Sequence, residues 1–127
     1  MTKNFKIKEF KCKSGAVMPL EVYENIIKLA GQLQFLRDYT GRPIRINSAY
    51  RSPEHNKKVG GSKTSQHLLG KAADITIDSL KPIEVFTLIE DLIDMRLMLQ
   101  GGLGHYDTFV HYDIRKTKAR WNYARKV

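Results

Sequence analysis

Two histidines and an aspartate, carried by two distant stretches of the chain, are the side chains best suited to metal chemistry. His67 and Asp74 close a polar, glycine-containing stretch that begins at Ser48. His111 lies far downstream in the short run Phe109–Asp113, where apolar residues precede it. Two histidines and one carboxylate are the ligand set of an open catalytic zinc site, in which water takes the fourth position. We therefore predict that the two stretches meet in space and hold one zinc ion per chain.

The spacing of this set explains how its members could converge. Six residues separate His67 from Asp74, so the two side chains cannot share one turn of a helix. Gly70 and the small pair Ala72-Ala73 would let a loop fold back and turn both toward one point. His111 is half-buried by its sequence pattern, and a buried histidine needs a polar partner. The spacing alone is also compatible with a histidine in a surface loop and a solvated aspartate at the start of a strand.

Other polar side chains near these stretches have several possible roles. Asp113 comes two residues after His111, so it would project from the same face of a strand. It could act as a general base, orient a metal ligand as a neighbouring carboxylate, or pair with an arginine. Asp107 could be a base or an ordinary turn residue. His55 is expected at the surface or as a neighbour that supports the ligands, and His105 at the surface at a strand end rather than as a ligand.

Hydrophobic periodicity predicts the helices that must position these residues. Apolar side chains recur at three- and four-residue steps from Pro19 to about Tyr39 and from Ile83 to about Met98, which indicates two main helices. The expected buried face of the first helix consists of Leu20, Tyr23, Ile26, Ile27, Ala30, Leu33 and Leu36. That of the second consists of Phe86, Ile89, Leu92 and Ile93, and Gly101-Gly102 is expected to end it.

Short alternating or apolar runs predict the remaining elements. Strands are expected at Ile44–Tyr50, Ala72–Ile77, Leu103–Tyr106 and Phe109–Ile114, and a short helix at Pro53–Val59. Arg51 would lie at the end of the first strand. This order of elements predicts a small α+β domain in which two main helices pack on an antiparallel sheet.

Length and composition fit one compact domain over residues 1–127, of which 42% are hydrophobic. Residues 1–17 are expected to form a loose arm whose apolar side chains lie on the domain. The chain has no run of roughly 18 apolar residues, which argues against a membrane span. It also shows no apolar segment typical of a secretory signal, so we expect a cytoplasmic location at synthesis. The single cysteine, Cys12, excludes an internal disulfide and is a poor zinc-finger candidate.

The chain carries a net charge of +9, which attracts polyanions such as nucleic acid, anionic lipid or an acidic cell wall. The charge is concentrated in a basic C-terminal tail, residues 115–127, which has six basic and no acidic residues. By itself this tail would support nucleic-acid binding as readily as any other function.

Several motifs together resemble the zinc D-alanyl-D-alanine carboxypeptidase family of murein metallopeptidases, which is related in fold to the hedgehog signalling domain. The resemblance extends from about Phe5 to Trp121. It is carried by Ser48-x-Tyr50-Arg51-Ser52-Pro53, Asn56, Val59-Gly60-Gly61, Ser65-x-His67-x-x-Gly70-x-Ala72-x-Asp74 and Phe109-Val110-His111-x-Asp113.

The resemblance implies a small α+β fold and hydrolysis of an amide that involves D-amino acids in peptidoglycan stem peptides or cross-links. His67, Asp74 and His111 match the three zinc ligands of the family. Arg51 and Ser65 match positions that contact the carboxylate or carbonyl of the substrate. Tyr50, in the same motif as Arg51, is a further substrate-binding candidate.

One departure from the family concerns the general base. Many relatives place a carboxylate three residues before the last histidine ligand, or a histidine two before it, whereas this chain has Thr108 and Phe109 there. The chain instead resembles the branch with His-x-Asp. Asp113 is therefore the leading candidate for the base or a supporting role, and Asp107 is second. A base would take a proton from the zinc-bound water, and Arg51 would steady a carboxylate or the developing oxyanion.

Three functions remain open on this sequence. The first is a monomeric peptidoglycan peptidase that acts on the wall after release or as part of a virion, as a phage-type lysin does. The second is a catalytically silent structural or wall-binding domain that keeps the zinc, which the missing carboxylate before His111 favours. The third, a nucleic-acid binder, rests on the basic tail alone, and nucleic acid is not the partner we expect.

Overall fold

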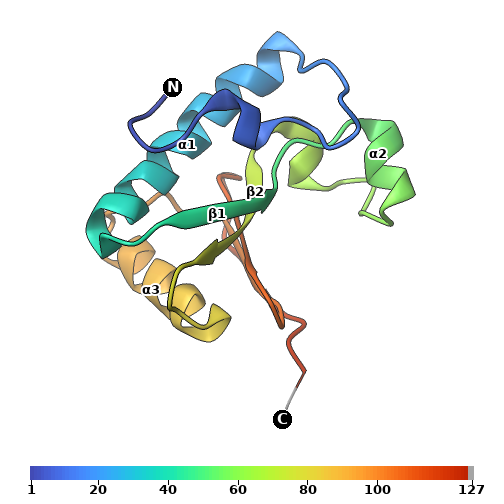
Figure 1. Cartoon of the computed structure of the whole chain (residues 1–127). Helices are drawn as coiled ribbons and strands as arrows, with labels where there is room; N and C mark the ends of the chain where they lie inside the picture. Colours follow the sequence, from blue (N-terminus) through green and yellow to red (C-terminus); the bar gives the residue numbers. More distant parts are fainter. Residues whose placement is uncertain (126–127) are drawn as a thin grey trace.

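A five-stranded sheet carries Asp74 and His111, two of the three expected zinc ligands. The computed structural model describes residues 1–125, and Figure 1 shows their arrangement. The helices are α1 (Leu20–Thr40), α2 (Pro53–Lys58) and α3 (Pro82–Asp94), with short 3-10 helices η1 (Ile7–Phe10) and η2 (Gln66–Leu69). The strands are β1 (Ile44–Ser48), β2 (Ala72–Ile77), β3 (Gly102–His105), β4 (Val110–Asp113) and β5 (Ala119–Asn122).

The strand order is β1-β2-β4-β3-β5. Neighbours pair antiparallel from β1 to β3, and β5 runs parallel to β3. The α+β fold class is confirmed, and the expected antiparallel pairing holds for four of the five strands. In the part of the chain that the structure describes, no helix is both long and apolar enough to cross a membrane.

The two faces of the sheet have different environments because side chains alternate along each strand. Ile75, Val110 and Tyr112 are fully buried in the apolar core, on the face covered by α1 and α3 (Figure 1). Asp74 and His111 alternate with them along β2 and β4 and therefore point to the opposite face. The alternation therefore places Asp74 and His111 next to each other on the face of the sheet that α1 and α3 do not cover.

Helix α1 buries four of its seven expected residues, Ile26, Ala30, Leu33 and Leu36, but the edges of the buried stripe differ from those expected. Leu20 and Ile27 are 72% and 47% exposed, whereas Val22 and Leu29 are buried. The buried stripe is Val22, Ile26, Leu29, Ala30, Leu33 and Leu36. This helix has apolar residues on more than one side, so periodicity alone did not define the edges of the buried stripe. Val22 is buried where α1 meets the end of η2 at Gly70.

Helix α3 ends at Asp94 rather than near Met98, so its expected end was wrong. Arg96 adopts a left-handed conformation with φ of 61°, and its N–H donates to the carbonyl of Ile93. The N–H of Leu97 donates to Leu92. These two bonds form a Schellman end, which the sequence usually marks with glycine at the left-handed position. Because arginine occupies it here, the stop signal was not visible.

The segment expected as a basic tail contributes an edge strand, β5. Gly104 of β3 pairs with Trp121 of β5. Arg120 forms an ion pair with Glu90 of α3, with Nε and Oε2 2.8 Å apart, so part of the positive charge of this segment is neutralised within the molecule. Residues 126–127 lie outside the described part of the chain.

The N-terminal arm is more ordered than expected. Phe5, Phe10 and Cys12 are buried, which confirms that its apolar residues lie on the domain. The rings of Phe5 and Phe10 meet edge to face, and the N–H of Tyr50 donates to the carbonyl of Phe10. The arm therefore supports the segment that follows β1 and leads into Arg51.

Candidate active site

His67 is held by the turn η2 and by the segment after β1. Ser65 caps the turn by accepting a hydrogen bond from the N–H of His67. Gly70 ends it with φ of 71°, and a Cβ there would lie 2.7 Å from Val22 Cγ1 of α1, so this close approach requires glycine. The Nδ1 atom of His67 donates to the carbonyl oxygen of Ala49 at 2.6 Å. That bond assigns the tautomer and leaves the lone pair of Nε2 facing Asp74.

Asp74 and His111 are brought together by strand pairing. They are cross-strand partners in β2 and β4. Asp74 Oδ1 lies 3.1 Å from both His67 Nε2 and His111 Nδ1. The three side chains are buried, and one donor atom from each lies within 4.8 Å of the others.

Asp113 fixes the orientation of His111 from behind. Its Oδ2 accepts a hydrogen bond from His111 Nε2 at 2.7 Å. The guanidinium of Arg115 donates to both carboxylate oxygens, at 2.9 and 2.7 Å, and the N–H of Gly102 donates to Oδ1 at 2.8 Å. Asp113 is fully buried. Its oxygens are therefore occupied by partners that hold it in place behind the histidine.

The protonation preferences of this cluster are those of a cation site. Burial alone would raise the pKa of Asp74, but hydrogen bonds with His111 and His67 outweigh it and hold that pKa far below its usual range. The pKa of Asp113 is likewise depressed, because the bonds from His111 and Arg115 outweigh its burial. Burial would lower the pKa of His111, but its two carboxylate partners raise it above the usual value. The carboxylates thus stay ionised and favour a positive charge between them.

The donor set fits a metal ion. The far nitrogens of His67 and His111 donate to Ala49 and Asp113, so each neutral imidazole presents the lone pair of its near nitrogen to Asp74. Only a protonated imidazole can donate to that carboxylate. Three acceptors that converge repel one another unless a proton or a metal ion lies between them. Two imidazoles, each fixed by a hydrogen bond from its other nitrogen, and one carboxylate are a typical protein site for zinc.

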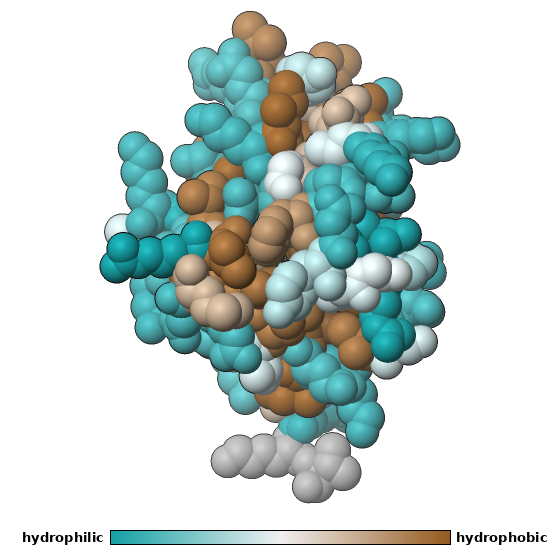
Figure 2. Space-filling model, turned by 90° about the vertical axis from the view of Figure 1, so that its left-hand side faces the viewer, coloured by the Kyte–Doolittle hydropathy of each residue, from teal (hydrophilic) through white to brown (hydrophobic). Residues whose placement is uncertain are grey.

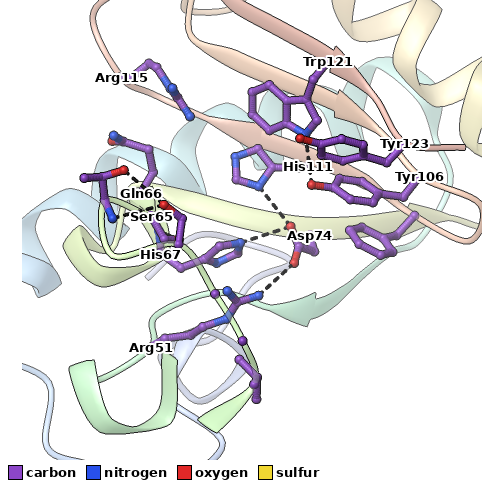
Figure 3. A pocket seen from close by; sticks show the side chains of 16 residues that line it. Arg51, Ser65, Gln66, His67, Asp74, Tyr106, His111, Arg115, Trp121 and Tyr123 are labelled. Atoms are coloured by element: carbon purple, nitrogen blue, oxygen red, sulfur yellow. Dashed lines mark hydrogen bonds and ion pairs between the residues drawn. The ribbon is translucent and has the colours of Figure 1, made fainter. Parts of the chain in front are cut away.

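His67, Asp74 and His111 line a cavity of about 600 Å³. Arg51 lines one side; its Nη2 lies 3.4 Å from Asp74 Oδ2, and its contacts with Ser48 and Asn56 are also long, at 3.3 and 3.4 Å. Ser65 lines the cavity as well. Figure 3 shows Arg51 on one side of Asp74 and an aromatic group on the other. We call this group the aromatic wall; it consists of Tyr106, Phe109, Trp121 and Tyr123.

A family model described as Peptidase M15 matches residues 3–113, which contain all three donor residues. The chain belongs to the peptidase M15 family. Among curated relatives, the Zinc D-Ala-D-Ala carboxypeptidase of Streptomyces albus G is 36% identical over 62 residues, which is 48% of this chain. The match spans 24% of that relative's length. These comparisons confirm the family inferred from the sequence motifs.

Several candidate residues lie elsewhere in this M15 chain. Asp107 is in the β3–β4 turn, outside the residues that line the cavity, and forms an exposed ion pair with Arg125. Tyr50 is buried in the apolar core and does not line the cavity. Asp113 is close to His111 but is also absent from the cavity lining. Among the described residues, Asp74 is therefore the only carboxylate that lines it.

The aromatic wall and Arg115 were not predicted as parts of the site. Trp121 follows the matched range, and its place depends on the β3–β5 pairing. A signal was present in β3 and the residue after it, because Gly102, Gly104 and Tyr106 recur at every second position. Such a repeat places three residues on one face of a strand, and the two glycines mark close approach by other groups.

Proposed function

We propose that this chain is a zinc metallopeptidase that hydrolyses an amide bond involving a D-amino acid in peptidoglycan, at a stem peptide or a cross-link. The observation that carries the proposal is the convergence of three donor atoms within 4.8 Å at the wall of a cavity of about 600 Å³. The named activity of the Streptomyces relative supports the substrate class.

In this proposal the zinc ligands are His67 Nε2, Asp74 and His111 Nδ1. When bound, zinc acts as a Lewis acid that polarises a carbonyl and lowers the pKa of water. The backbone carbonyl of Ala49 and the carboxylate of Asp113 keep the two imidazoles turned toward the site.

Arg51 is proposed to bind a carboxylate of the substrate or the developing oxyanion. Its present contacts are long, so its guanidinium can exchange them for a substrate group without losing strong bonds. A planar fork of N–H donors matches the two oxygens of a carboxylate. Ser65 lines the same cavity and is proposed to contact the substrate carbonyl.

Asp113 is proposed as the residue that positions His111 rather than as the general base. Its oxygens are engaged by His111, Arg115 and Gly102, and it is fully buried. A base must reach the proton that it removes. Asp107, paired with Arg125 outside the cavity lining, is not favoured by this geometry.

The wall-directed role is supported by charge. A net charge of +9 favours adsorption to an anionic cell wall. We propose that the chain meets peptidoglycan after release from a cell or as part of a virion, in the manner of a phage-type lysin. Retention on isolated walls that weakens with salt is the expected behaviour.

The test is incubation of the zinc-loaded chain with isolated peptidoglycan, followed by mass spectrometry of the released fragments. New free amines should appear, and the fragment masses should identify the bond. They should vanish with a chelator and in His67→Ala, but persist in His55→Ala, which removes a histidine outside the cavity. Release that survives both chelation and His67→Ala would contradict a metallopeptidase.

A catalytically silent zinc-containing domain is the second candidate. It is favoured by the finding that Asp74 is the only cavity-lining carboxylate among residues 1–125. One zinc per chain, retained wall binding and no release of amines in the same digest would establish it.

A further inference from the structure

Tyr106 directly follows strand β3 and lines the cavity. Its backbone N–H donates to the carbonyl of Phe109, which closes the turn between β3 and β4. The rings of Tyr106 and Phe109 stack with centroids 4.3 Å apart and planes 12° apart. The hairpin therefore restricts the tyrosine ring without any help from a bound ligand.

Trp121 is fitted against β3 next to this ring. A Cβ on Gly104 would overlap the indole, so the absence of a side chain there creates the space that the indole fills. The Nε1 atom of Trp121 donates to the hydroxyl oxygen of Tyr106 at 2.9 Å. The indole ring also lies 5.0 Å, centroid to centroid, from the imidazole of His111.

The hydroxyl group of Tyr106 accepts a hydrogen bond and keeps its own proton available as a donor. An indole N–H can only donate, so the oxygen of Tyr106 is the acceptor in its bond with Trp121. Within the described residues, no acceptor takes the proton of the Tyr106 hydroxyl. Burial, together with the negative charge of Asp74, raises the pKa of Tyr106, so the hydroxyl stays protonated at neutral pH. Figure 3 shows the hydroxyl directed from its strand toward the centre of the cavity.

We propose that Tyr106 contacts the substrate and donates a hydrogen bond from its hydroxyl to the carbonyl oxygen of the scissile amide, with Trp121 as its positioning residue. This inference rests on the proposed peptidase function. Of the two roles proposed for Arg51, on the other side of Asp74, its fixed charge suits the contact with a substrate carboxylate, a group that is already anionic. A neutral donor instead suits an oxygen whose negative charge develops during the reaction.

The expected fall in kcat can be estimated from other enzymes in which a hydrogen-bond donor to a developing oxyanion was removed. Removal of one preorganised donor to a developing oxyanion lowers kcat by roughly 100- to 1,000-fold. The bond from Trp121 polarises the Tyr106 hydroxyl and strengthens it as a donor. Because the bond matters most in the transition state, its loss should reduce kcat far more than it raises KM.

The experiment compares zinc-loaded wild type, Tyr106→Phe, Trp121→Phe and the control Tyr39→Phe, which removes an exposed phenol hydroxyl from α1. The rate of free-amine release from isolated peptidoglycan should fall about 100-fold in Tyr106→Phe, less in Trp121→Phe, and not in the control. Zinc content should be equal in all four proteins. Trp121 is the only tryptophan, so its single indole ¹H–¹⁵N resonance reports the bond to Tyr106 independently of activity. That resonance should shift in Tyr106→Phe and stay in place in Tyr39→Phe.

Binding of the phosphinate analogue of D-alanyl-D-alanine, measured by calorimetry, separates the two proposals. Its anionic oxygen represents the developing oxyanion, so Tyr106→Phe should bind it about 100-fold more weakly than wild type. If wild type cleaves and Tyr106→Phe cleaves within threefold of it, the role of Tyr106 is overturned while the peptidase stands. If wild type cleaves nothing but binds the phosphinate in a Tyr106-dependent way, the peptidase fails and the contact stands. Absence of both cleavage and binding overturns both.

Discussion

Asp74 and His111 face each other across the antiparallel pair β2–β4, with Asp74 Oδ1 3.1 Å from His111 Nδ1. This pairing sets the separation of two donor atoms by backbone hydrogen bonds rather than by a flexible loop. His67 reaches the same oxygen from η2, whose ends are held by Ser65 and Gly70. The site is therefore preorganised, and its weak points are the residues that hold the donors in position.

The first prediction concerns the carboxylate behind His111. Asp113→Asn keeps the size of the side chain but removes its charge, so His111 loses its anionic partner. Zinc affinity should fall by roughly 10- to 100-fold, the usual effect of such a change. A competitive zinc chelator titration measures it. Asp91→Asn, at an exposed carboxylate of α3, should leave the affinity unchanged; equal affinity in Asp113→Asn and wild type would exclude the positioning role.

The second prediction concerns Gly102, which makes room for Asp113. A Cβ added there would overlap the Asp113 carboxylate. Gly102→Ala should therefore destabilise the fold by roughly 1–3 kcal/mol, as overpacking of a buried site does. Urea unfolding measures the change.

A matched glycine provides the control for Gly102→Ala. Gly31 lies within α1, and a Cβ added there meets nothing within 4 Å. Gly31→Ala should stabilise the protein by about 0.5–1 kcal/mol, the ordinary gain for alanine within a helix. If both variants shift stability in the same direction, the steric account of Gly102 is wrong.

The third prediction is the pH dependence of the metal-free protein. The pKa of Asp113 is depressed, so its stabilising contribution is present above the ordinary aspartate value of 3.8 and is lost as pH falls below it. The pKa of His111 is raised, so its contribution is present below the ordinary value of 6.5 and is lost as pH rises through the higher folded value. Metal-free protein should therefore be most stable between about pH 4 and 6.5. Denaturant unfolding across a pH series tests this, and stability that increases steadily from pH 6 to 9 would contradict it.

The fourth prediction concerns Arg51. Arg51→Lys keeps the charge but loses the planar fork, so one of two charge-assisted bonds to a substrate carboxylate is lost. Such bonds contribute about 1.5–3 kcal/mol, which corresponds to a fall in kcat/KM of roughly 10- to 100-fold. Zinc content should not change. Arg45→Lys, at an exposed position of β1, is the matched control. A fall of the same size in both variants would assign the effect to surface charge.

Much of this architecture could be predicted because it depends on local patterns. Strand β2 was expected at its observed bounds, and His67, Asp74 and His111 were expected to converge. The end of α3 could not be foreseen because Arg96 occupies a conformation that glycine usually marks. Strand β5 was missed because the alternation in Ala119–Asn122 is only four residues long and lies within a basic segment, and the strand forms by pairing with β3. The aromatic wall, which needs that pairing to receive Trp121, was missed for the same reason.

The outer surface of the molecule exposes apolar side chains as well as polar ones. Figure 2 shows apolar side chains interspersed among polar ones on one face of the molecule. Large apolar residues such as Leu20 and Met95 remain more than half exposed on the described surface. Single exposed apolar residues are normal in folded proteins and need no functional explanation.

The residues that line the cavity come from two parts of the chain, because the parallel strand β5 adds Trp121 from beyond β4. All three donors lie within the range shared with the family, residues 3–113, whereas Trp121 and Tyr123 are supplied after it. The segment that follows β4 also reaches the donor residues from behind, because Arg115 donates to Asp113 and the indole of Trp121 lies against the imidazole of His111. A truncation after β4 should therefore weaken zinc binding as well as open the cavity on the side of the aromatic wall.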